Sequence, residues 1–247
     1  MNIAMWSGPR NLSTALMYSF GARGDCAVVD EPFYAAYLRE SGSVHPMGDE
    51  ILARQESDPD RVAALCAGPA PDGSPVFYQK QMAHHMRPGF DLAWMGRVRN
   101  VFLIRHPAHV IASYHVKRQD PTVEDIGAPQ LTRLFERAAE LEGAAPAVID
   151  SADIRRAPEA ALRALCARIG LAFDPAMMNW PAGGHPSDGV WAPHWYGAVH
   201  KSTGFVASAE TVPQVPAHLV PVLDAALPDY EALRAHAIAV DAHADAD

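Results

Sequence analysis

The chain has 247 residues, of which 49% are hydrophobic and 20% charged, a composition typical of a folded globular protein with one large domain or two small ones. Its formal net charge of −9 argues against a nucleic-acid backbone or an anionic membrane surface as the main partner, so any anion site has to be local. The three widely spaced cysteines predict no disulfide framework, and neither a secretory signal nor an apolar run of about 18 residues is found, so we expect a cytoplasmic protein with no membrane partner.

Short apolar runs recur along the chain and predict strands at residues 2–6, 26–30, 75–80, 100–105 and 147–151. Longer stretches of helical character separate them. Strands that are apolar throughout are typical of a parallel sheet whose two faces are both covered by helices. The pattern therefore predicts an α/β fold of three layers, with a doubly wound, mainly parallel sheet of about five strands.

The predicted helices follow these strands in order. The first begins after residue 11 and ends near Gly21 or Gly24, the second runs from Pro107 to just before Asp120, and two amphipathic helices lie within 129–144 and 158–170. Residues 239–247 are polar and acidic and predict a frayed tail.

Two long segments, 41–74 and 179–216, are rich in turn-forming residues and do not fit the alternation of strand and helix. Connections of this length in a compact domain are usually lids, binding loops or small insertions. We expect one domain over residues 1–247, with insertions at these two places and no linker.

The turn between the first strand and the first helix has the composition of an anion-binding loop. In a parallel sheet such a turn presents backbone N–H groups and the positive end of a helix to a ligand. Arginine and hydroxyl side chains in it suit phosphate or sulfate oxygens. The alternative is a plain turn whose Ser and Thr cap the helix. The loop consists of Ser7, Gly8, Pro9, Arg10, Asn11, Leu12, Ser13 and Thr14, and it lacks the second glycine and the lysine of a Walker A loop.

A second element supports this interpretation. Arg105 ends the fourth predicted strand, and Ser113 follows eight residues later on the next helix. The pair resembles the strand and helix that bind the 3′-phosphate in sulfotransferases using 3′-phosphoadenosine 5′-phosphosulfate (PAPS). Residues 9–14 resemble the family's 5′-phosphosulfate loop, in which a glycine is usual where this chain has Leu12. The late loop of Lys201, Ser202, Thr203 and Gly204 resembles the one that closes over the same nucleotide.

The resemblance implies the transfer of a sulfuryl group from PAPS to a hydroxyl or amine of a small-molecule acceptor. Fixed donors and Arg10 would compensate charge on the transferring group, so no metal is expected. Glu31 follows the second strand and resembles the glutamate of the Glu-Pro motif in carbohydrate-type sulfotransferases, the proposed general base; the alternative is that it caps a helix beginning at Pro32.

Three further residues come from the stretch after the third strand. His84 and His85 are the alternative bases, because an imidazole titrates near pH ~6.5, although adjacent histidines are often solvated or structural. Lys80 is a candidate cation near the transferring group, with a surface lysine as the alternative. An aromatic cluster of Trp191, Trp195 and Tyr196 either lines the acceptor pocket or forms a small satellite core.

Two other functions compete with the sulfotransferase interpretation. One is a small-molecule kinase in which Asp30, after the second strand, binds magnesium. The other is a non-catalytic nucleotide-binding homologue, which would keep Arg105 and Ser113 but not depend on Glu31. The sequence predicts neither the acceptor nor the oligomeric state.

Overall fold

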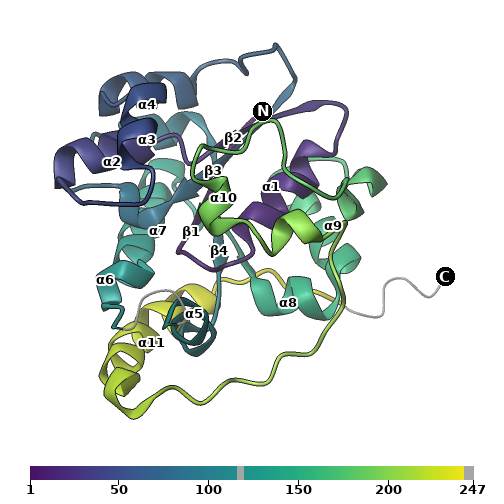
Figure 1. Ribbon diagram of the computed structural model, residues 1–247. Helices are drawn as coiled ribbons and strands as arrows, with labels where there is room; N and C mark the ends of the chain where they lie inside the picture. Colours follow the sequence, from purple (N-terminus) through teal and green to yellow (C-terminus); the bar gives the residue numbers. More distant parts are fainter. Residues whose placement is uncertain (116–119, 242–247) are drawn as a thin grey trace.

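Five parallel strands form the centre of the computed structural model, which describes residues 1–115 and 120–241 (Figure 1). Their order across the sheet is β2-β3-β1-β4-β5, and all four neighbouring pairs are parallel, which confirms the predicted fold class. The strands are β1 (Asn2–Ser7), β2 (Cys26–Asp30), β3 (Val76–Met82), β4 (Arg99–Ile104) and β5 (Ala147–Asp150).

Helices cover both faces of the sheet and lie around its edges (Figure 1). None of the helices in the described ranges is long and apolar enough to cross a membrane. The α-helices are α1 (Ser13–Gly21), α2 (Tyr34–Ser41), α3 (Gly48–Arg54), α4 (Pro59–Ala67), α5 (Pro107–His115), α6 (Val123–Ile126), α7 (Ala128–Glu142), α8 (Ser151–Arg156), α9 (Pro158–Ile169), α10 (Ala192–Trp195) and α11 (Val220–Arg234). The 3₁₀ turns are η1 (Ala83–His85), η2 (Ala93–Arg97), η3 (Pro175–Met178), η4 (Val199–Lys201) and η5 (Ala217–Leu219).

The two faces of the sheet form separate cores, because successive side chains of a strand point to opposite sides. In β1, Ile3 and Met5 pack in one core with residues of α1, α8 and α9. Ala4 and Trp6 pack in the other core with residues of α2, α4, α7 and α11. All four of these β1 side chains are fully buried, as expected for the central strand of a three-layer fold.

The segments that did not fit the predicted alternation are built differently from each other. Within 41–74, α3 and α4 are regular helices, and Val62 and Cys66 of α4 pack into the core that contains Ala4 and Trp6. Within 179–216, α10 and η4 are followed by residues 205–216, which have no regular secondary structure. The predicted helix after Pro107 is described to His115; residues 116–119, and residues 242–247 of the predicted tail, lie outside the described residues.

The strand order decides where a ligand can bind. Because β1 lies between β3 and β4, the loops that follow these three strands meet at the same edge of the sheet. Ligands of open parallel sheets bind in the crevice outside this carboxyl edge. The anion-binding loop, Lys80 with the two histidines, and Arg105 all belong to this edge.

Candidate active site

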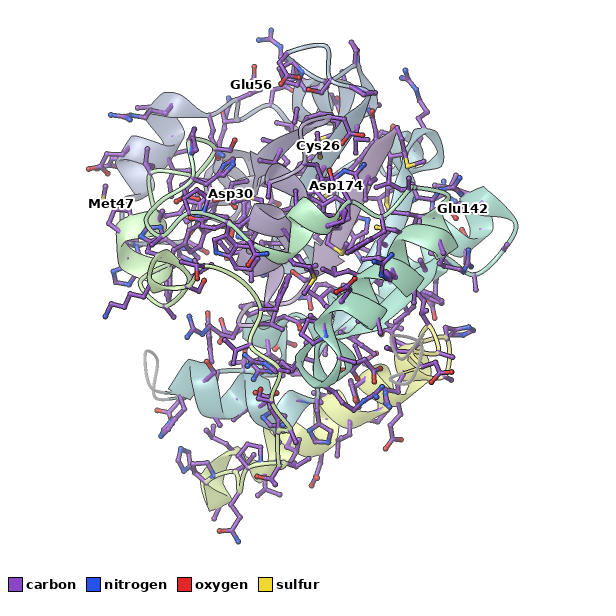
Figure 2. All side chains as sticks on the ribbon, turned by 90° about the vertical axis from the view of Figure 1, so that its right-hand side faces the viewer. Cys26, Asp30, Met47, Glu56, Glu142 and Asp174 are labelled. Carbon is purple, nitrogen blue, oxygen red and sulfur yellow. The ribbon has the colours of Figure 1, made fainter. Side chains whose placement is uncertain are left out.

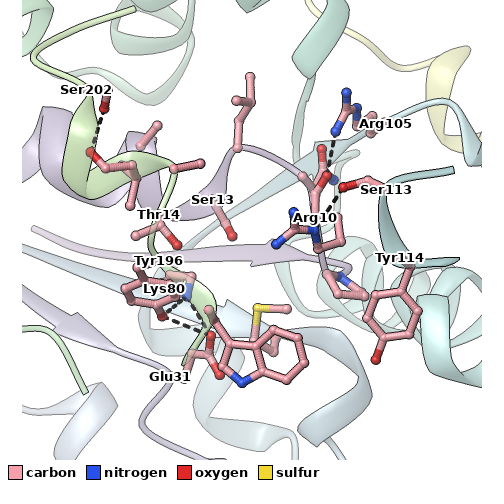
Figure 3. A pocket seen from close by; sticks show the side chains of 18 of the residues that line it. Arg10, Ser13, Thr14, Glu31, Lys80, Arg105, Ser113, Tyr114, Tyr196 and Ser202 are labelled. Atoms are coloured by element: carbon pink, nitrogen blue, oxygen red, sulfur yellow. Dashed lines mark hydrogen bonds and ion pairs between the residues drawn. The ribbon is translucent and has the colours of Figure 1, made fainter. Parts of the chain in front are cut away.

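A cavity of about 510 Å³ opens at the carboxyl edge of the sheet. Figure 3 shows two groups of polar side chains in it, with Ser13 and Thr14 between them. One group contains Arg10, Arg105 and Ser113, and the other contains Glu31, Lys80 and Tyr196. Residues predicted from five separate parts of the sequence therefore line one cavity.

The loop after β1 has an unusual backbone. Arg10 and Leu12 adopt the left-handed conformation, with φ of 58° and 57°. For residues other than glycine this conformation costs roughly 1–2 kcal/mol each, and it is typical of functional loops. Leu12 therefore keeps the conformation that glycine would adopt with least strain. The capping alternative for this loop is wrong, because Leu12 is the N-cap residue of α1 and no side chain caps the helix.

The loop is anchored to its neighbours through Asn11, Gly8 and Ser7. Asn11 donates to the carbonyl of Leu103 in β4 at 2.6 Å. Gly8 packs so closely against Ile126 that an added Cβ would lie 2.5 Å from the Ile126 carbonyl oxygen. The Ser7 hydroxyl faces Met82 and does not line the cavity, and neither does Gly8, whereas the loop from Pro9 to Thr14 does. Ser7 and Gly8 therefore shape the loop from behind.

Arg105 and Ser113 lie against this loop. The Arg105 guanidinium donates from Nη1 to the backbone carbonyl of Arg10 at 2.7 Å, and Arg10 Nε donates to the Ser113 hydroxyl at 2.9 Å. Arg105 also pairs through Nη2 with the Glu210 carboxylate at 2.9 Å. The two predicted anion-binding elements thus share one edge of the sheet and contact each other directly.

The second group is a buried charge cluster. Asp30 and Lys80 are register partners in β2 and β3, so their side chains lie on one face of the sheet. Lys80 Nζ donates to Asp30 at 2.9 Å, to Glu31 Oε1 at 2.5 Å and to the Tyr196 hydroxyl at 2.6 Å. Lys80 is 1% exposed, so the surface alternative for it is wrong. Burial alone would lower the pKa of Lys80, but the charges of Asp30 and Glu31 raise it.

Glu31 is held in place by its backbone and by this cluster. Its φ of 43° is a left-handed conformation, and its side chain binds Lys80 and not the start of α2, whose N-cap residue is Phe33. The helix-capping alternative for Glu31 is therefore wrong. Its second carboxylate oxygen, Oε2, lies 3.9 Å from His85 Nε2. Glu31 lines the cavity, and Lys80 holds only its Oε1.

Asp30 has no such freedom. It is 3% exposed, and its two oxygens accept hydrogen bonds from Lys80, from the Tyr196 hydroxyl and from the backbone N–H of Gly189. Burial raises the pKa of Asp30 to about 6, although Lys80 opposes this. A carboxylate engaged in this way does not suit the magnesium ligand that the kinase hypothesis requires.

The histidines and several aromatic rings form the end of the cavity beyond Glu31. The His85 ring stacks on Tyr34 and Tyr37, with centroid distances of 4.4 and 4.9 Å, and the His84 ring lies 4.4 Å from it. Nδ1 of each histidine is buried and makes no hydrogen bond within the described residues. His85 is buried and His84 is partly exposed, and burial lowers the pKa of His84 to about 4 and that of His85 well below 6.5.

Acidification is expected to destabilise the protein through these histidines. In the unfolded chain the two histidines take up protons near pH ~6.5, whereas in the folded protein they stay neutral at that pH. The free energy of unfolding is therefore highest above pH ~6.5 and decreases as the pH falls towards the pKa of the folded state. Each histidine adds up to about 1.4 kcal/mol per pH unit to the fall. Urea unfolding between neutral and mildly acidic pH should show a flatter decline for His85→Phe, which keeps the stacked ring. Asp30 acts in the opposite direction but equally in both proteins, so parallel curves would contradict the prediction.

The late loop only partly reaches the cavity. Ser202 and Gly204 line it, but Thr203 and Lys201 do not, and Lys201 is exposed. The aromatic cluster does both of the things that were expected as alternatives. Trp191 and Tyr196 pack in a small core with Tyr34, Leu38 and Ile51, with Trp195 against it, and Trp195 and Tyr196 also line the cavity.

Several residues that line the cavity were not predicted from the sequence, among them Tyr114, His45 and Arg155. Tyr114 and His45 come from α5 and from the loop after α2, and nothing in their local sequence marks them. Arg155 also lines the cavity, and its signal was present: it follows the fifth predicted strand, whose carboxyl end lies at the same edge of a parallel sheet.

The comparisons with known proteins agree with this geometry. A family model described as a sulfotransferase domain matches residues 1–237. Two Arabidopsis thaliana proteins, named branched-chain-amino-acid aminotransferase-like protein 1 and 2, are each 37% identical to the chain over 236 and 237 residues, which is 95% of this chain. These matches cover 42% and 41% of the two proteins, so the chain spans about two fifths of the curated relatives it matches.

Three solved structures share the fold. The sulfotransferase domain of the Synechococcus PCC 7002 olefin synthase has 18% identity and a TM-score of 0.51, over 91% of this chain and 93% of that one. The sulfotransferase from Alicyclobacillus acidocaldarius has 14% identity and a TM-score of 0.52, over 95% and 94%. The sulfotransferase domain from the curacin biosynthetic pathway has 13% identity and a TM-score of 0.50, over 91% and 96%.

Proposed function

The chain belongs to the sulfotransferase domain family, and from this premise we propose that it transfers a sulfuryl group from PAPS to a hydroxyl or amine of a small-molecule acceptor. One observation carries the proposal: a single cavity is lined by the loop from Pro9 to Thr14, by Arg105 with Ser113, and by Glu31. A bisphosphorylated adenosine needs an anion pocket at each end, and an acceptor needs a base beside the transferring group.

In this proposal the loop binds the phosphosulfate end of the donor. Ser13 and Thr14 at the start of α1 supply hydroxyls and backbone N–H groups, and Arg10 supplies a fixed charge. Arg105 and Ser113 bind the 3′-phosphate. Such donors, fixed in place before the reaction, stabilise the leaving phosphate without reorganisation in the transition state.

Glu31 acts as the general base. Its carboxylate takes the proton of the acceptor while the acceptor oxygen or nitrogen bonds to sulfur and the bond from sulfur to the 5′-phosphate oxygen breaks, which releases 3′,5′-ADP. Lys80 holds Glu31 Oε1, so Oε2 is the oxygen that accepts the proton. The neutral histidines and the aromatic rings of Tyr34, Tyr114 and Trp195 form the acceptor end of the cavity.

We further propose that residues 1–247 act as one sulfotransferase-like domain, with the segments 41–74 and 179–216 as insertions over the site. Support comes from the second segment, because the Tyr196 hydroxyl accepts a hydrogen bond from Lys80 and Glu210 forms an ion pair with Arg105. In the first segment, His45 lines the cavity, whereas α4 belongs to the core.

A thermal-shift panel tests the proposed donor. 3′,5′-ADP is expected to stabilise the protein without added metal and more strongly than 5′-AMP or ATP with magnesium. A larger shift with magnesium and ATP would favour the kinase. An acceptor screen with labelled sulfate donor then identifies the class of acceptor.

Arg105→Ala is expected to weaken 3′,5′-ADP binding by roughly 10- to 100-fold, because hydrogen bonds to charged groups are worth about 1.5–3 kcal/mol each. 5′-AMP, which lacks the 3′-phosphate, should lose little. Calorimetry of both ligands measures this, with Arg99→Ala at the exposed start of β4 as the matched control. Equal weakening of the two ligands would remove the 3′-phosphate role from Arg105.

A further inference from the structure

The extended segment 205–216, here called the strap, has an exposed middle part in which one residue turns inward. The strap runs from the end of the late loop past α8 towards α11 (Figure 1). Of residues 206–212, only Glu210 is not exposed, and Val206 and Val212 are 80% and 60% exposed. The strap is fastened at Ser208, whose N–H donates to the backbone carbonyl of Arg155 at 2.7 Å.

Glu210 lies between two arginines. Its Oε1 is 2.9 Å from Arg105 Nη2 and 3.2 Å from Arg155 Nε, and its Oε2 is 3.9 Å from His109 Nδ1. The side chains of Arg105, Arg155 and Glu210 are 11%, 29% and 20% exposed. Figure 2 shows the side chains of the described residues as sticks on the ribbon, seen from the right-hand side of Figure 1.

The carboxylate satisfies this pair of arginines incompletely. Two guanidinium charges face one carboxylate charge, and Arg105 Nε is buried without a hydrogen-bond partner among the described residues. A phosphate monoester brings about −1.5 to −2 charge and three acceptor oxygens, so it matches two forked guanidinium groups better than a carboxylate does. The arginines therefore form an anion site with more capacity than Glu210 uses.

Arg155 is a cation of this site that the prediction of the late loop did not include. Lys201 of the late loop is exposed and does not line the cavity, whereas Arg155 does, on the same side as Arg105. Arg155 is carried by α8, directly after β5, and so approaches the Arg105 pocket from the neighbouring strand.

We propose that Arg155 and Arg105 together bind the 3′-phosphate of the donor, and that Glu210 is a built-in competitor which this phosphate displaces together with the strap. The inference rests on the proposed function. It makes the strap a discriminating element, because a nucleotide without a 3′-phosphate leaves Glu210 on the arginines and the strap in place.

Calorimetry with 3′,5′-ADP and 5′-AMP tests the two residues. Glu210→Gln is expected to bind 3′,5′-ADP about tenfold more tightly than wild type, and Arg155→Ala about tenfold more weakly, each with less than about a twofold change for 5′-AMP. The matched controls are Glu159→Gln, a surface ion-pair glutamate, and Arg156→Ala, the exposed neighbour of Arg155; both should bind like wild type. Unchanged 3′,5′-ADP affinity in both test variants would overturn the proposal.

A second measurement follows the strap itself. Hydrogen exchange of peptides covering 206–212 should speed up when 3′,5′-ADP is added to wild type and not when 5′-AMP is added, because the Ser208 amide loses its bond to Arg155. Should Glu210→Gln fail to fold, Ser208→Pro removes that amide while leaving Glu210 intact, and it is expected to tighten 3′,5′-ADP binding in the same direction. Unchanged exchange and unchanged affinity would contradict the displacement.

Inorganic phosphate separates this inference from the proposed function. If 3′,5′-ADP binds neither wild type nor Glu210→Gln, but phosphate stabilises Glu210→Gln more than wild type in a thermal-shift assay, the donor is wrong and the anion site stands. If phosphate stabilises the wild type and Glu210→Gln equally, the anion site at the two arginines is refuted as well.

Discussion

Glu31→Gln is expected to lower kcat for sulfuryl transfer by about 10²–10⁴-fold, the usual contribution of a general base. The amide keeps the size and most of the hydrogen bonds of the carboxylate but cannot accept the acceptor's proton. Affinity for 3′,5′-ADP should stay within about twofold, because the donor's two anions bind elsewhere in the cavity. The measurement is transfer of labelled sulfate at saturating donor, with calorimetry of 3′,5′-ADP on the same protein.

The histidines provide the control for this prediction. His85→Phe keeps the ring that stacks on Tyr34 and Tyr37, so it is expected to lower kcat far less than Glu31→Gln. The reverse order would make His85 the base. If the wild-type protein has measurable activity and both variants transfer sulfate at the wild-type rate, neither residue is the base. If wild type binds 3′,5′-ADP but transfers nothing to any acceptor, the non-catalytic alternative is favoured.

Lys80→Met is expected to cost about 3–5 kcal/mol in the free energy of unfolding, because removing one partner of a buried ion pair leaves uncompensated charge. Methionine fills much of the same space, but Asp30 and Glu31 would then face each other without a cation between them. The Tyr196 hydroxyl would also lose the ammonium that it contacts at 2.6 Å. Urea unfolding of the two proteins at neutral pH measures the difference.

The pH dependence of this loss distinguishes charge from packing. Without Lys80, whose charge lowers the pKa of Asp30, that pKa rises further, so protonation of Asp30 relieves the repulsion and the difference from wild type should shrink as the pH is lowered towards about 5. Tyr196→Phe is the matched control, since it removes one hydroxyl from the cluster and no charge; it should cost about 1–3 kcal/mol with little pH dependence. A Lys80→Met difference that is constant with pH would assign the loss to packing.

Much of the site was predictable because parallel strands place their following residues at one edge. Arg10, Glu31, Lys80 and Arg105 each come at or just after the carboxyl end of a predicted strand, and all of them line the same cavity. Arg155 obeys the same rule and was missed because its helix carries no motif. Glu210 obeys no local rule: it belongs to an irregular segment, and only the path of the chain brings it to Arg105.

The sequence by itself determined the α/β class, the five strands and the place of the loop of residues 7–14 between a strand and a helix. It could do so because apolar periodicity and turn residues act locally. Strand order, and with it the contact between Arg10 and the strand of Arg105, came only from the tertiary structure. The tertiary structure also decided that Lys80 is buried between two carboxylates, that the pKa values of the histidines are lowered, and that Glu210 forms ion pairs with Arg105 and Arg155. These are properties of burial and of pairing between distant segments, which no stretch of sequence contains alone.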